Sequence, residues 1–505
     1  MSDWTDGYVT NTDYTSHFYP YLSPQAQNFA VLLSGAMPAD IGGGFNYCEL
    51  GCGQGYTTAL LAAANPNGHF WGVDFNPSHI AGANKMQAAA GLTNVTFLEK
   101  SFAELKDADL PPFEFIALHG IWSWISAANR EALTAFIYAK LKPGGIVYIS
   151  YNALPGWAAA APLRQLMVES QRHKTDIDAA AVDDALSVVR RMKDMGAAFF
   201  KANPAITQDF DLMGKMPKNY IMHEYFNRDW TPFYFSDVAG EMRKAKLAFT
   251  CSSDIAEHLD QLCIGKDAKE MLTGFADTTA RETIRDYFRN RRFRRDLFTR
   301  GARKLSADER ITMLRATRLA LITLPPEFPL QVTFPVGSVT IPAEPFSVIA
   351  TMLAEKSCTL GALMGDARLV KLGYQGVFQA VLLLVAAGRV QAALAEAGEA
   401  ERRQSTARFN TAMLASAVGR EAQSLASPVM GNGITVSTTE QFIMALERGG
   451  QHLTPDGLTR LLTAKKITLQ TPPGAEAPAD QSAAVAELLA SYRRRQGLFQ
   501  RLGIL

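Results

Sequence analysis

The residues best placed to do chemistry lie in one short stretch near the N-terminus. Glu49 is followed at alternating positions by Gly51, Gly53 and Gly55, and Asp74 comes about one strand–helix unit later. Glycines let the backbone approach a ligand closely and adopt turn dihedrals that a side chain would forbid. An acid at the end of the next strand is placed to accept hydrogen bonds from ribose hydroxyls. This layout predicts a nucleoside-binding loop, although a glycine-rich turn can also be purely structural.

The charge and spacing of the loop favour a cationic ligand over a dinucleotide. A dinucleotide fingerprint needs G-x-G-x-x-G and holds a pyrophosphate at the helix N-terminus. Here the third glycine comes one residue early, and Glu49 would repel a pyrophosphate but attract a sulfonium and an amino group. The loop therefore predicts an S-adenosyl-L-methionine site. The predicted cofactor-binding residues are Glu49, Gly51, Cys52, Gly53, Gln54, Gly55, Asp74, Phe75, Ser101, Phe102 and His119.

The elements that must position these residues alternate between strands and helices. Apolar runs predict strands at residues 69–73, 95–98, 113–118 and 146–150, and residues 141–145 predict a turn. Strands separated by helical segments predict an α/β fold with a doubly wound, Rossmann-like parallel sheet. Ligands of such sheets bind at the carboxyl edge, where the fourth and fifth strands deliver residues 119–124 and 151–157.

An amine acceptor for the methyl group would need desolvation and a proton acceptor, because free lysine has a pKa near 10.4. Aromatic rings lower that pKa by burial, and a carboxylate, Tyr or His can take the proton through water. The candidate catalytic residues are Tyr151, Asn152, Trp157, His223, Glu224 and Tyr14. Tyr14, Tyr19 and Tyr21 are also expected to fold over the ligand. Each tyrosine could instead be packed in a lid or core, and His223 could be a core or helix-cap histidine.

Composition limits the class of protein. The 505 residues are too many for one core, and the net charge of +1 gives no field for nucleic acid or an anionic membrane. The five cysteines lack metal-ligand spacing, so we expect reduced thiols in the cytoplasm and no metal. The N-terminus lacks a signal-peptide pattern, and the longest apolar run, 380–387, is too short to span a membrane.

Beyond residue 160 the chain changes character. Apolar spacing of three and four predicts helices at 162–216 that could cap the site or pair with a second subunit. Residues 281–303 are densely basic and predict a solvated helix with Phe288 and Phe293 facing a core, or alternatively an anion-binding face. Two β-like runs at 331–334 and 338–341, three helices at 346–355, 359–364 and 374–387, and a strand from 388 are typical of a winged helix. The third helix lacks basic groove-facing residues, which favours protein docking over DNA.

Segments 118–124, 150–157 and 220–225 resemble those of bacterial methyltransferases that carry a methyltransferase regulatory domain. That family includes the rickettsial protein-lysine methyltransferases that modify outer-membrane protein B. The resemblance extends more weakly to 293–295 and 425–429. It implies a cofactor domain, a helical insertion used for dimerisation, a middle domain and a winged-helix-like part. The chain departs from the usual pattern at Ser101, where an acid meets the adenine amine, while Phe102 could still pack on the adenine ring.

Together these features predict five regions. They are an S-adenosylmethionine-binding methyltransferase domain (1–160), a helical insertion (161–218), a middle or regulatory domain (219–323), a winged-helix-like domain (324–400) and a C-terminal helical region (401–505). We expect a cytoplasmic methyltransferase that modifies lysine side chains of a protein, such as an outer-membrane or surface protein before export, and that can form a homodimer. No nucleic-acid partner is expected. The alternatives are a small-molecule or glycan acceptor, or a binding protein that senses the cofactor.

Overall fold

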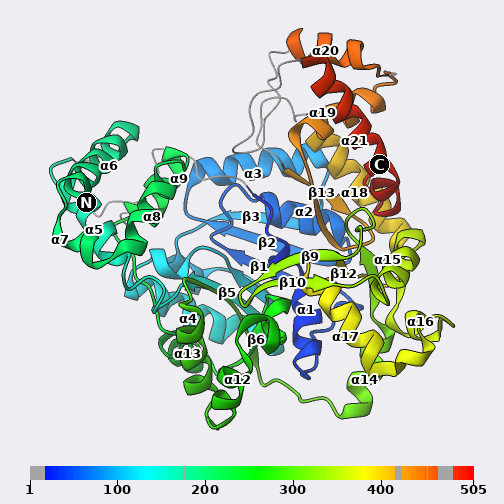
Figure 1. Cartoon of the computed structure of the whole chain (residues 1–505), viewed down its shortest axis with the longest axis horizontal. Helices are drawn as coiled ribbons and strands as arrows, with labels where there is room; N and C mark the ends of the chain where they lie inside the picture. The colour runs from blue at the N-terminus through cyan, green and yellow to red at the C-terminus, as the bar shows by residue number, and fades with distance from the viewer. Residues whose placement is uncertain (1–16, 175–176, 416–422, 452, 465–480) are drawn as a thin grey trace.

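A seven-stranded sheet forms the centre of the computed structural model, which describes residues 17–174, 177–415, 423–451, 453–464 and 481–505 (Figure 1). The strands are β1 (Phe45–Leu50), β2 (Gly68–Asp74), β3 (Val95–Glu99), β4 (Phe113–Leu118), β5 (Leu141–Asn152), β6 (Leu247–Ser252) and β7 (Phe293–Arg300). Their spatial order is β3-β2-β1-β4-β5-β7-β6. β1 to β5 are parallel, while β7 is antiparallel to both β5 and β6. The predicted α/β, Rossmann-like class is confirmed.

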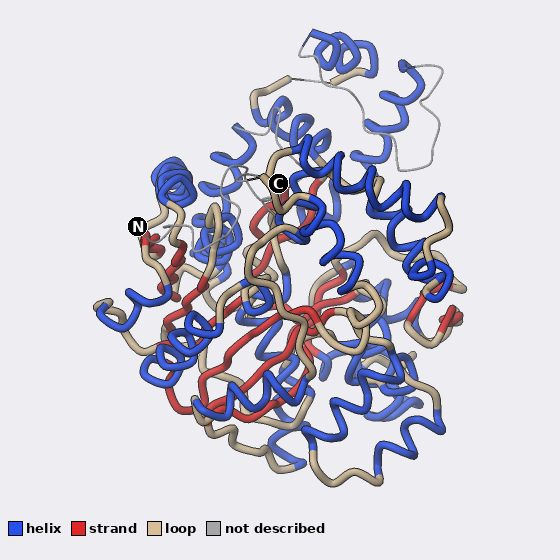
Figure 2. The backbone as a smooth tube through the Cα atoms, turned by 90° about the vertical axis from the view of Figure 1, so that its left-hand side faces the viewer, coloured by secondary structure: helices blue, strands red, loops and turns tan. Residues whose placement is uncertain are grey.

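Helices cover both faces of the sheet, so the central strands are buried on both sides and read as continuous apolar runs (Figure 2). One face packs against α1 (Pro24–Leu33), α2 (Tyr56–Ala64) and α3 (Pro77–Ala90). The other packs against α4 (Ala127–Lys140) and α10 (Phe235–Lys244). The strand order reverses between β1 and β4, and ligands of such sheets bind outside the carboxyl ends at that point.

The turn predicted at residues 141–145 lies inside β5. Leu141 pairs with Phe113 and Ile146 pairs with Phe115, so the residues between them bulge out of the ladder. Gly144, with φ +78°, supplies the left-handed conformation that this bulge uses. The strand therefore begins before the predicted turn and does not start after it.

The sheet extends across the predicted boundary between the methyltransferase and middle regions, because β6 and β7 come from residues 219–323. The basic segment 281–303 is correspondingly not one solvated helix. It forms the end of α13 (Thr278–Arg289) and then β7. Phe288 is 46% exposed, contrary to the expectation that it faces a core. Pairing with β5 and β6, which lie far away in sequence, overrides the local helical pattern.

The helical insertion, residues 161–218, forms a lobe beside the sheet (left side of Figure 1). Its helices are α5 (Ala161–Ser170), α6 (Ala179–Asp194), α7 (Ala198–Ala202), α8 (Pro204–Met213) and, continuing past it, α9 (Lys218–Tyr225). The apolar positions that predicted helices, such as Leu163, Met167 and Val182, share one core with Trp157 and Ile221. That core ties α9 to the end of β5.

α11 (Asp260–Cys263) and α12 (Lys266–Thr273) lie between β6 and α13 in the chain. The region after β7 begins with α14 (Ala307–Ala316). A small sheet has the order β11-β8-β12, and β9 and β10 form a hairpin. These elements are β8 (Arg318–Leu321), β9 (Leu330–Phe334), β10 (Gly337–Ile341), α15 (Phe346–Glu355), β11 (Cys358–Thr359), α16 (Leu360–Gly365), α17 (Gly373–Ala386) and β12 (Val390–Ala393). The two predicted β-like runs, the three helices and the strand are therefore present, the two runs pairing as a hairpin. Their interpretation as a winged helix stays a prediction.

The last section packs directly on the cofactor half of the chain. It contains α18 (Glu399–Ala415), β13 (Gln423–Ser427), β14 (Asn432–Val436), α19 (Thr438–Arg448), α20 (Pro455–Ala464) and α21 (Gln481–Arg501). α18 contacts α2 and α3, and Phe409 shares a core with Leu60. The hydroxyl of Tyr56 donates a hydrogen bond to the backbone carbonyl of Ser424. Among the helices that the structure describes, none is long and apolar enough to cross a membrane.

Candidate functional site

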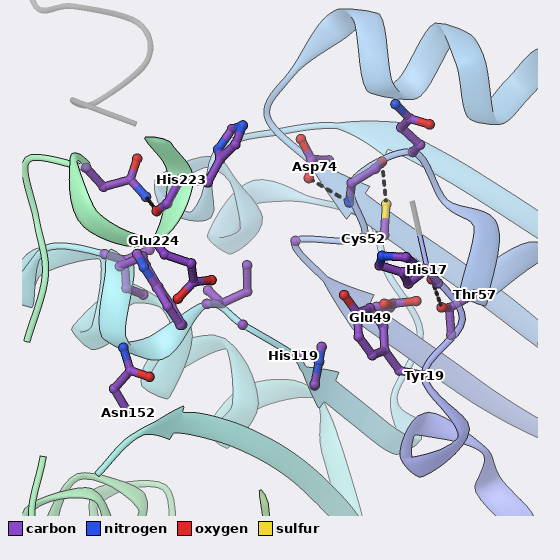
Figure 3. A pocket seen from close by; sticks show the side chains of 18 of the residues that line it. His17, Tyr19, Glu49, Cys52, Thr57, Asp74, His119, Asn152, His223 and Glu224 are labelled. Atoms are coloured by element: carbon purple, nitrogen blue, oxygen red, sulfur yellow. Dashed lines mark hydrogen bonds between the residues drawn. The ribbon is translucent and has the colours of Figure 1, made fainter. Parts of the chain in front are cut away.

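A cavity of about 910 Å³ lies at the carboxyl edge of the sheet, beside the point where the strand order reverses (Figure 3). Nine of the predicted cofactor residues line it: Glu49, Gly51, Cys52, Gly53, Gln54, Asp74, Phe75, Phe102 and His119. Four of the candidate catalytic residues line it as well: Asn152, Trp157, His223 and Glu224. In the view of Figure 3, Glu224 and Asn152 lie across the cavity from Cys52 and Asp74.

The three glycines of the loop after β1 serve different purposes. All have positive φ: +73° at Gly51, +54° at Gly53 and +70° at Gly55. A Cβ on Gly51 would lie 2.2 Å from Ile121 Cδ1, and one on Gly55 would lie 2.5 Å from Phe97 Cε1. A Cβ on Gly53 would meet no protein atom within 4 Å, and Gly53 lines the cavity. Only Gly53 therefore leaves open a cradle that a side chain would fill.

The carboxylate of Asp74, at the end of β2, is held at the rim of this cradle. Its Oδ2 accepts a hydrogen bond from the backbone N–H of Gly53 at 2.9 Å, and its Oδ1 accepts one from Asn76 N–H at 3.0 Å. His79 Nδ1 lies 3.2 Å from Oδ1. A carboxylate offers about four acceptor sites, so Asp74 keeps capacity for a hydroxyl donor of a ligand. This fits the ribose of a nucleoside.

Glu49 is a buried acid facing the same cavity. Burial raises its pKa from 4.5 to about 7, the hydrogen bond that Thr58 Oγ1 donates to Glu49 lowers it, and the neighbouring charge of Asp74 raises it. A nearby positive charge favours the ionised form of a carboxylic acid, and so a cationic partner would offset the effect of burial on Glu49. Glu49 therefore fits the cationic amino-acid end of S-adenosylmethionine.

His119 and Tyr19 both line the cavity and pack together, with ring centroids 3.9 Å apart. Burial, and then the charge of Arg295, lowers the pKa of His119 to about 3. Its Nδ1 lies 2.9 Å from the Tyr148 hydroxyl. Burial, then Glu49 and Glu224, raises the pKa of Tyr19 to about 12. Both groups are thus neutral at pH 7, and His119 is too weak a base to accept a proton readily.

Tyr151 does not line the cavity, contrary to the sequence-based expectation. It is fully buried, and its hydroxyl donates a hydrogen bond to Asp296 Oδ2 at 2.7 Å. Tyr151 pairs with Arg294 and Asn152 pairs with Phe293 across β5 and β7. Paired residues share a face, and faces alternate along a strand. Asn152 therefore faces the cavity, while Tyr151 faces the core beneath α10.

Three other predicted residues lie elsewhere. Gly55 caps the N-terminus of α2 and packs against Phe97, so its role is structural. Ser101 does not line the cavity, and its hydroxyl donates to Glu104 Oε2 at 2.7 Å in a capping box. Tyr14 lies outside the described residues.

The side of the cavity across from Cys52 and Asp74, which we call the acceptor end, holds the polar side chains of Glu224 and Asn152 (Figure 3). The rings of Trp124, Trp157 and Tyr220 line the same cavity. Asn152 is 3% exposed, and among the described residues its Nδ2 has no hydrogen-bond partner. Trp124, 8% exposed, likewise has no partner for its Nε1 among those residues. Buried donors without a partner cost free energy, so both fit an acceptor atom that a ligand supplies.

The sequence did not predict that Phe293 and Arg295 of β7, and Arg292 just before it, line the cavity, nor that His17 does. Tyr19 and Tyr21, which were expected to fold over the ligand, also line it. The signal that could have found the β7 residues is the alternation of Phe293, Arg294 and Arg295, which is a strand pattern.

Two family models match the chain: a methyltransferase domain over residues 41–201 and a predicted methyltransferase regulatory domain over residues 217–300. An uncharacterized Synechocystis protein is 38% identical over 442 residues, which are 87% of each chain. An uncharacterized Rickettsia prowazekii protein is 28% identical over 261 residues, 51% of this chain and 46% of that one. The structure of PKMT2 from Rickettsia typhi in complex with AdoHcy has 20% identity and a TM-score of 0.72, covering 97% of this chain and 100% of that one.

These matches and the cavity define a class. The sheet, the open Gly53 cradle and the acids at the ends of β1 and β2 are those of an S-adenosylmethionine-dependent methyltransferase. The chain belongs to the methyltransferases that carry a methyltransferase regulatory domain, and S-adenosylmethionine is its methyl donor.

Proposed function

We propose that the chain transfers a methyl group from S-adenosylmethionine to lysine side chains of a protein acceptor. One observation carries the proposal: Asp74 and Gly53, which fit the cofactor, line the same cavity as Glu224, Trp157 and Asn152. The acceptor end of the cavity suits the ammonium group of lysine. Aromatic rings attract a cation by cation–π interaction, and Glu224 adds a carboxylate.

When bound, S-adenosylmethionine supplies a methyl group already activated on a sulfonium. The residues of the chain then have to orient an amine, desolvate it and remove its proton. Burial among Trp124, Trp157 and Tyr220 disfavours the ammonium form and so lowers the amine pKa. His119, with its pKa near 3, is poorly suited to accept the proton. His223 and Glu224 are the side chains that we assign to hold or move it.

The lysine acceptor draws support from two sources. Segments 118–124, 150–157 and 220–225 resemble those of rickettsial protein-lysine methyltransferases. The fold is shared with rickettsial PKMT2 over nearly the whole of both chains. We further propose cytoplasmic action on an outer-membrane or surface protein before export, and a homodimer through the helical insertion. We also propose the five regions expected from the sequence, with the third contributing β6 and β7 to the central sheet. Met195 and Leu212 of the insertion, which are 75% and 57% exposed, support such a dimer contact.

A labelling experiment tests the acceptor. The full chain is incubated with methyl-labelled S-adenosylmethionine and bacterial protein extract, in parallel with extract whose lysines have been acetylated and with nuclease-treated extract. We expect label in protein from untreated and nuclease-treated extract and little in acetylated extract. Equal label after acetylation would reject lysine as the acceptor, and label confined to small molecules would move the acceptor to that class.

A further inference from the structure

A second, smaller cavity adjoins the methyl-transfer cavity along β7. Its volume is about 210 Å³. Arg292, Phe293 and Arg295 line both cavities, so the two are neighbours. Cavities that hold whole small ligands are usually about 300–1,000 Å³. The smaller one is therefore of a size to take a single group of a ligand that lies mainly in the larger cavity.

The lining of the smaller cavity is strongly cationic, and we call it the arginine cavity after Arg289, Arg291, Arg292 and Arg295. Arg289 and Arg291 both contact the buried carboxylate of Glu257. Arg292 Nη1 lies 2.7 Å from Asp209 Oδ2. Three of the four arginines thus have a carboxylate partner within the protein.

Arg295 differs from the other three. No carboxylate within the described ranges lies at ion-pair distance from it, and its Nε is buried without a hydrogen-bond partner there. Its guanidinium lies 4.4 Å from the ring centroid of Tyr21 and 5.3 Å from that of Phe293. The rings contact the guanidinium on its faces, and within the described ranges its buried Nε–H has no acceptor. A buried guanidinium donor in this state fits an oxygen acceptor from a ligand.

Carboxylates and arginines lie close together around the arginine cavity. Asp254 and Glu257 line it, and Asp209 and Asp286 pair with Arg292 and Arg291. Burial, and then the neighbouring charge of Arg291, lowers the pKa of Arg289 to about 10. The charge of Arg291 beside Arg289 is crowded positive charge, which an added anion would relieve.

We propose that the arginine cavity is a carboxylate-binding subsite of the methyl-transfer site, with Arg295 as the residue that meets the carboxylate. The two oxygens of a carboxylate fit the planar fork of a guanidinium such as that of Arg295. The methyl acceptor is the source we favour, as an acidic side chain near the acceptor lysine. That part rests on the proposed function. The other source with the same chemistry is the carboxylate of the cofactor's own amino-acid moiety.

Calorimetry on the full chain separates these sources without requiring turnover. The probe for the acceptor source is glutarate, titrated into protein saturated with S-adenosylhomocysteine. The probes for the cofactor source are S-adenosylhomocysteine itself and methylthioadenosine, which lacks the carboxylate. Each is measured with wild type, Arg295→Gln, Arg295→Lys and Arg172→Gln. Arg172 is 83% exposed and lines neither cavity, so its variant controls for loss of one charge.

If the acceptor supplies the carboxylate, glutarate binds to wild type saturated with S-adenosylhomocysteine. Arg295→Gln then lowers the affinity for glutarate at least about tenfold, as expected for the loss of a hydrogen bond to a charged group. If the cofactor supplies it, Arg295→Gln weakens S-adenosylhomocysteine by a similar factor and leaves methylthioadenosine unchanged. Either result supports the subsite, and Arg295→Lys should then fall between wild type and Arg295→Gln. Unchanged affinities for all probes, in a variant with wild-type near-ultraviolet circular dichroism and melting temperature, would overturn it. Failure to methylate lysine rejects only the proposed function, because these titrations involve no methyl transfer.

Discussion

The Asp74 carboxylate accepts a hydrogen bond from the backbone N–H of Gly53 at 2.9 Å. This bond joins the end of β2 to the loop after β1 at Gly53, where, unlike at Gly51 and Gly55, a Cβ would enter open space. The backbone N–H groups of Gly51 and Cys52 also donate to the Val73 carbonyl, at 2.8 and 3.0 Å. Two adjacent strand ends thus fix the cradle before any ligand arrives, which lowers the ordering cost of binding.

Replacing Asp74 tests the cofactor assignment. Asp74→Ala removes the acceptor that we assign to ribose, and a hydrogen bond to a charged group contributes about 1.5–3 kcal/mol. We therefore expect S-adenosylhomocysteine affinity to fall at least about tenfold by calorimetry. Glu99→Ala is the matched control, because Glu99 pairs with Asp74 at the neighbouring strand end, is exposed and does not line the cavity. Equal affinity in both variants would remove Asp74 from the cofactor site.

The raised pKa of Glu49 predicts a pH dependence of binding. The pKa of Glu49 in the folded protein, about 7, lies above the ordinary value of 4.5. The contribution of Glu49 to folding stability is therefore fully present below about pH 4.5 and is lost as the pH rises through about 7. The ionised form attracts a cationic ligand, so S-adenosylmethionine affinity should rise up to about tenfold between about pH 6 and about pH 8. Calorimetry across this range should show the rise in wild type and a nearly flat profile in Glu49→Gln. A rise of the same size in Glu49→Gln would assign the titration to another group.

The acceptor end predicts a separation of turnover from cofactor binding. Glu224→Gln keeps the side-chain shape but removes the charge that holds the amine, so kcat/KM for a lysine peptide should fall at least about tenfold. Affinity for S-adenosylhomocysteine should change by less than about threefold. Glu169→Gln, on the same lobe and 48% exposed, is the control and should match wild type. A kcat/KM for Glu224→Gln equal to that of the control would place the acceptor amine elsewhere.

Replacing Tyr151 should lower the free energy of unfolding and leave turnover unchanged. Tyr151→Phe deletes one hydroxyl that bonds to buried Asp296, which costs about 1–3 kcal/mol of unfolding free energy. We expect a lower thermal midpoint and a kcat/KM within about twofold of wild type. Tyr138→Phe removes a hydroxyl from a residue that is 42% exposed and should change neither quantity. A large loss of turnover in Tyr151→Phe at wild-type stability would return this tyrosine to the catalytic machinery.

The cofactor half of the site could be predicted because its signals are local. Strands such as β3 and β4 are short apolar runs bounded by turns, and the glycine spacing with Asp74 fixes the loop chemistry. The acceptor half depends on pairings that are distant in sequence. Whether Tyr151 or Asn152 faces the cavity is set by the register with β7, which begins only at Phe293. Local pattern alone could not supply that register.

The packing of the C-terminal section could not be predicted from the sequence for the same reason. Phe409 shares the core of Leu60, and Tyr56 bonds to Ser424, although these partners are hundreds of residues apart in the chain. The sequence predicted helices in this section but carried no signal for the surface on which they pack. Amphipathic spacing identifies an apolar face and does not identify the partner of that face.

Lysine methylation by this chain is tested most directly by mass spectrometry of lysine side chains in proteins from cells that make either the wild-type chain or Asp74→Ala. We expect methylated lysines that occur with wild type and are absent or strongly reduced with Asp74→Ala, although both proteins accumulate to the same level. An identical set of methylated lysines in the two samples, with wild type still consuming S-adenosylmethionine, would contradict it.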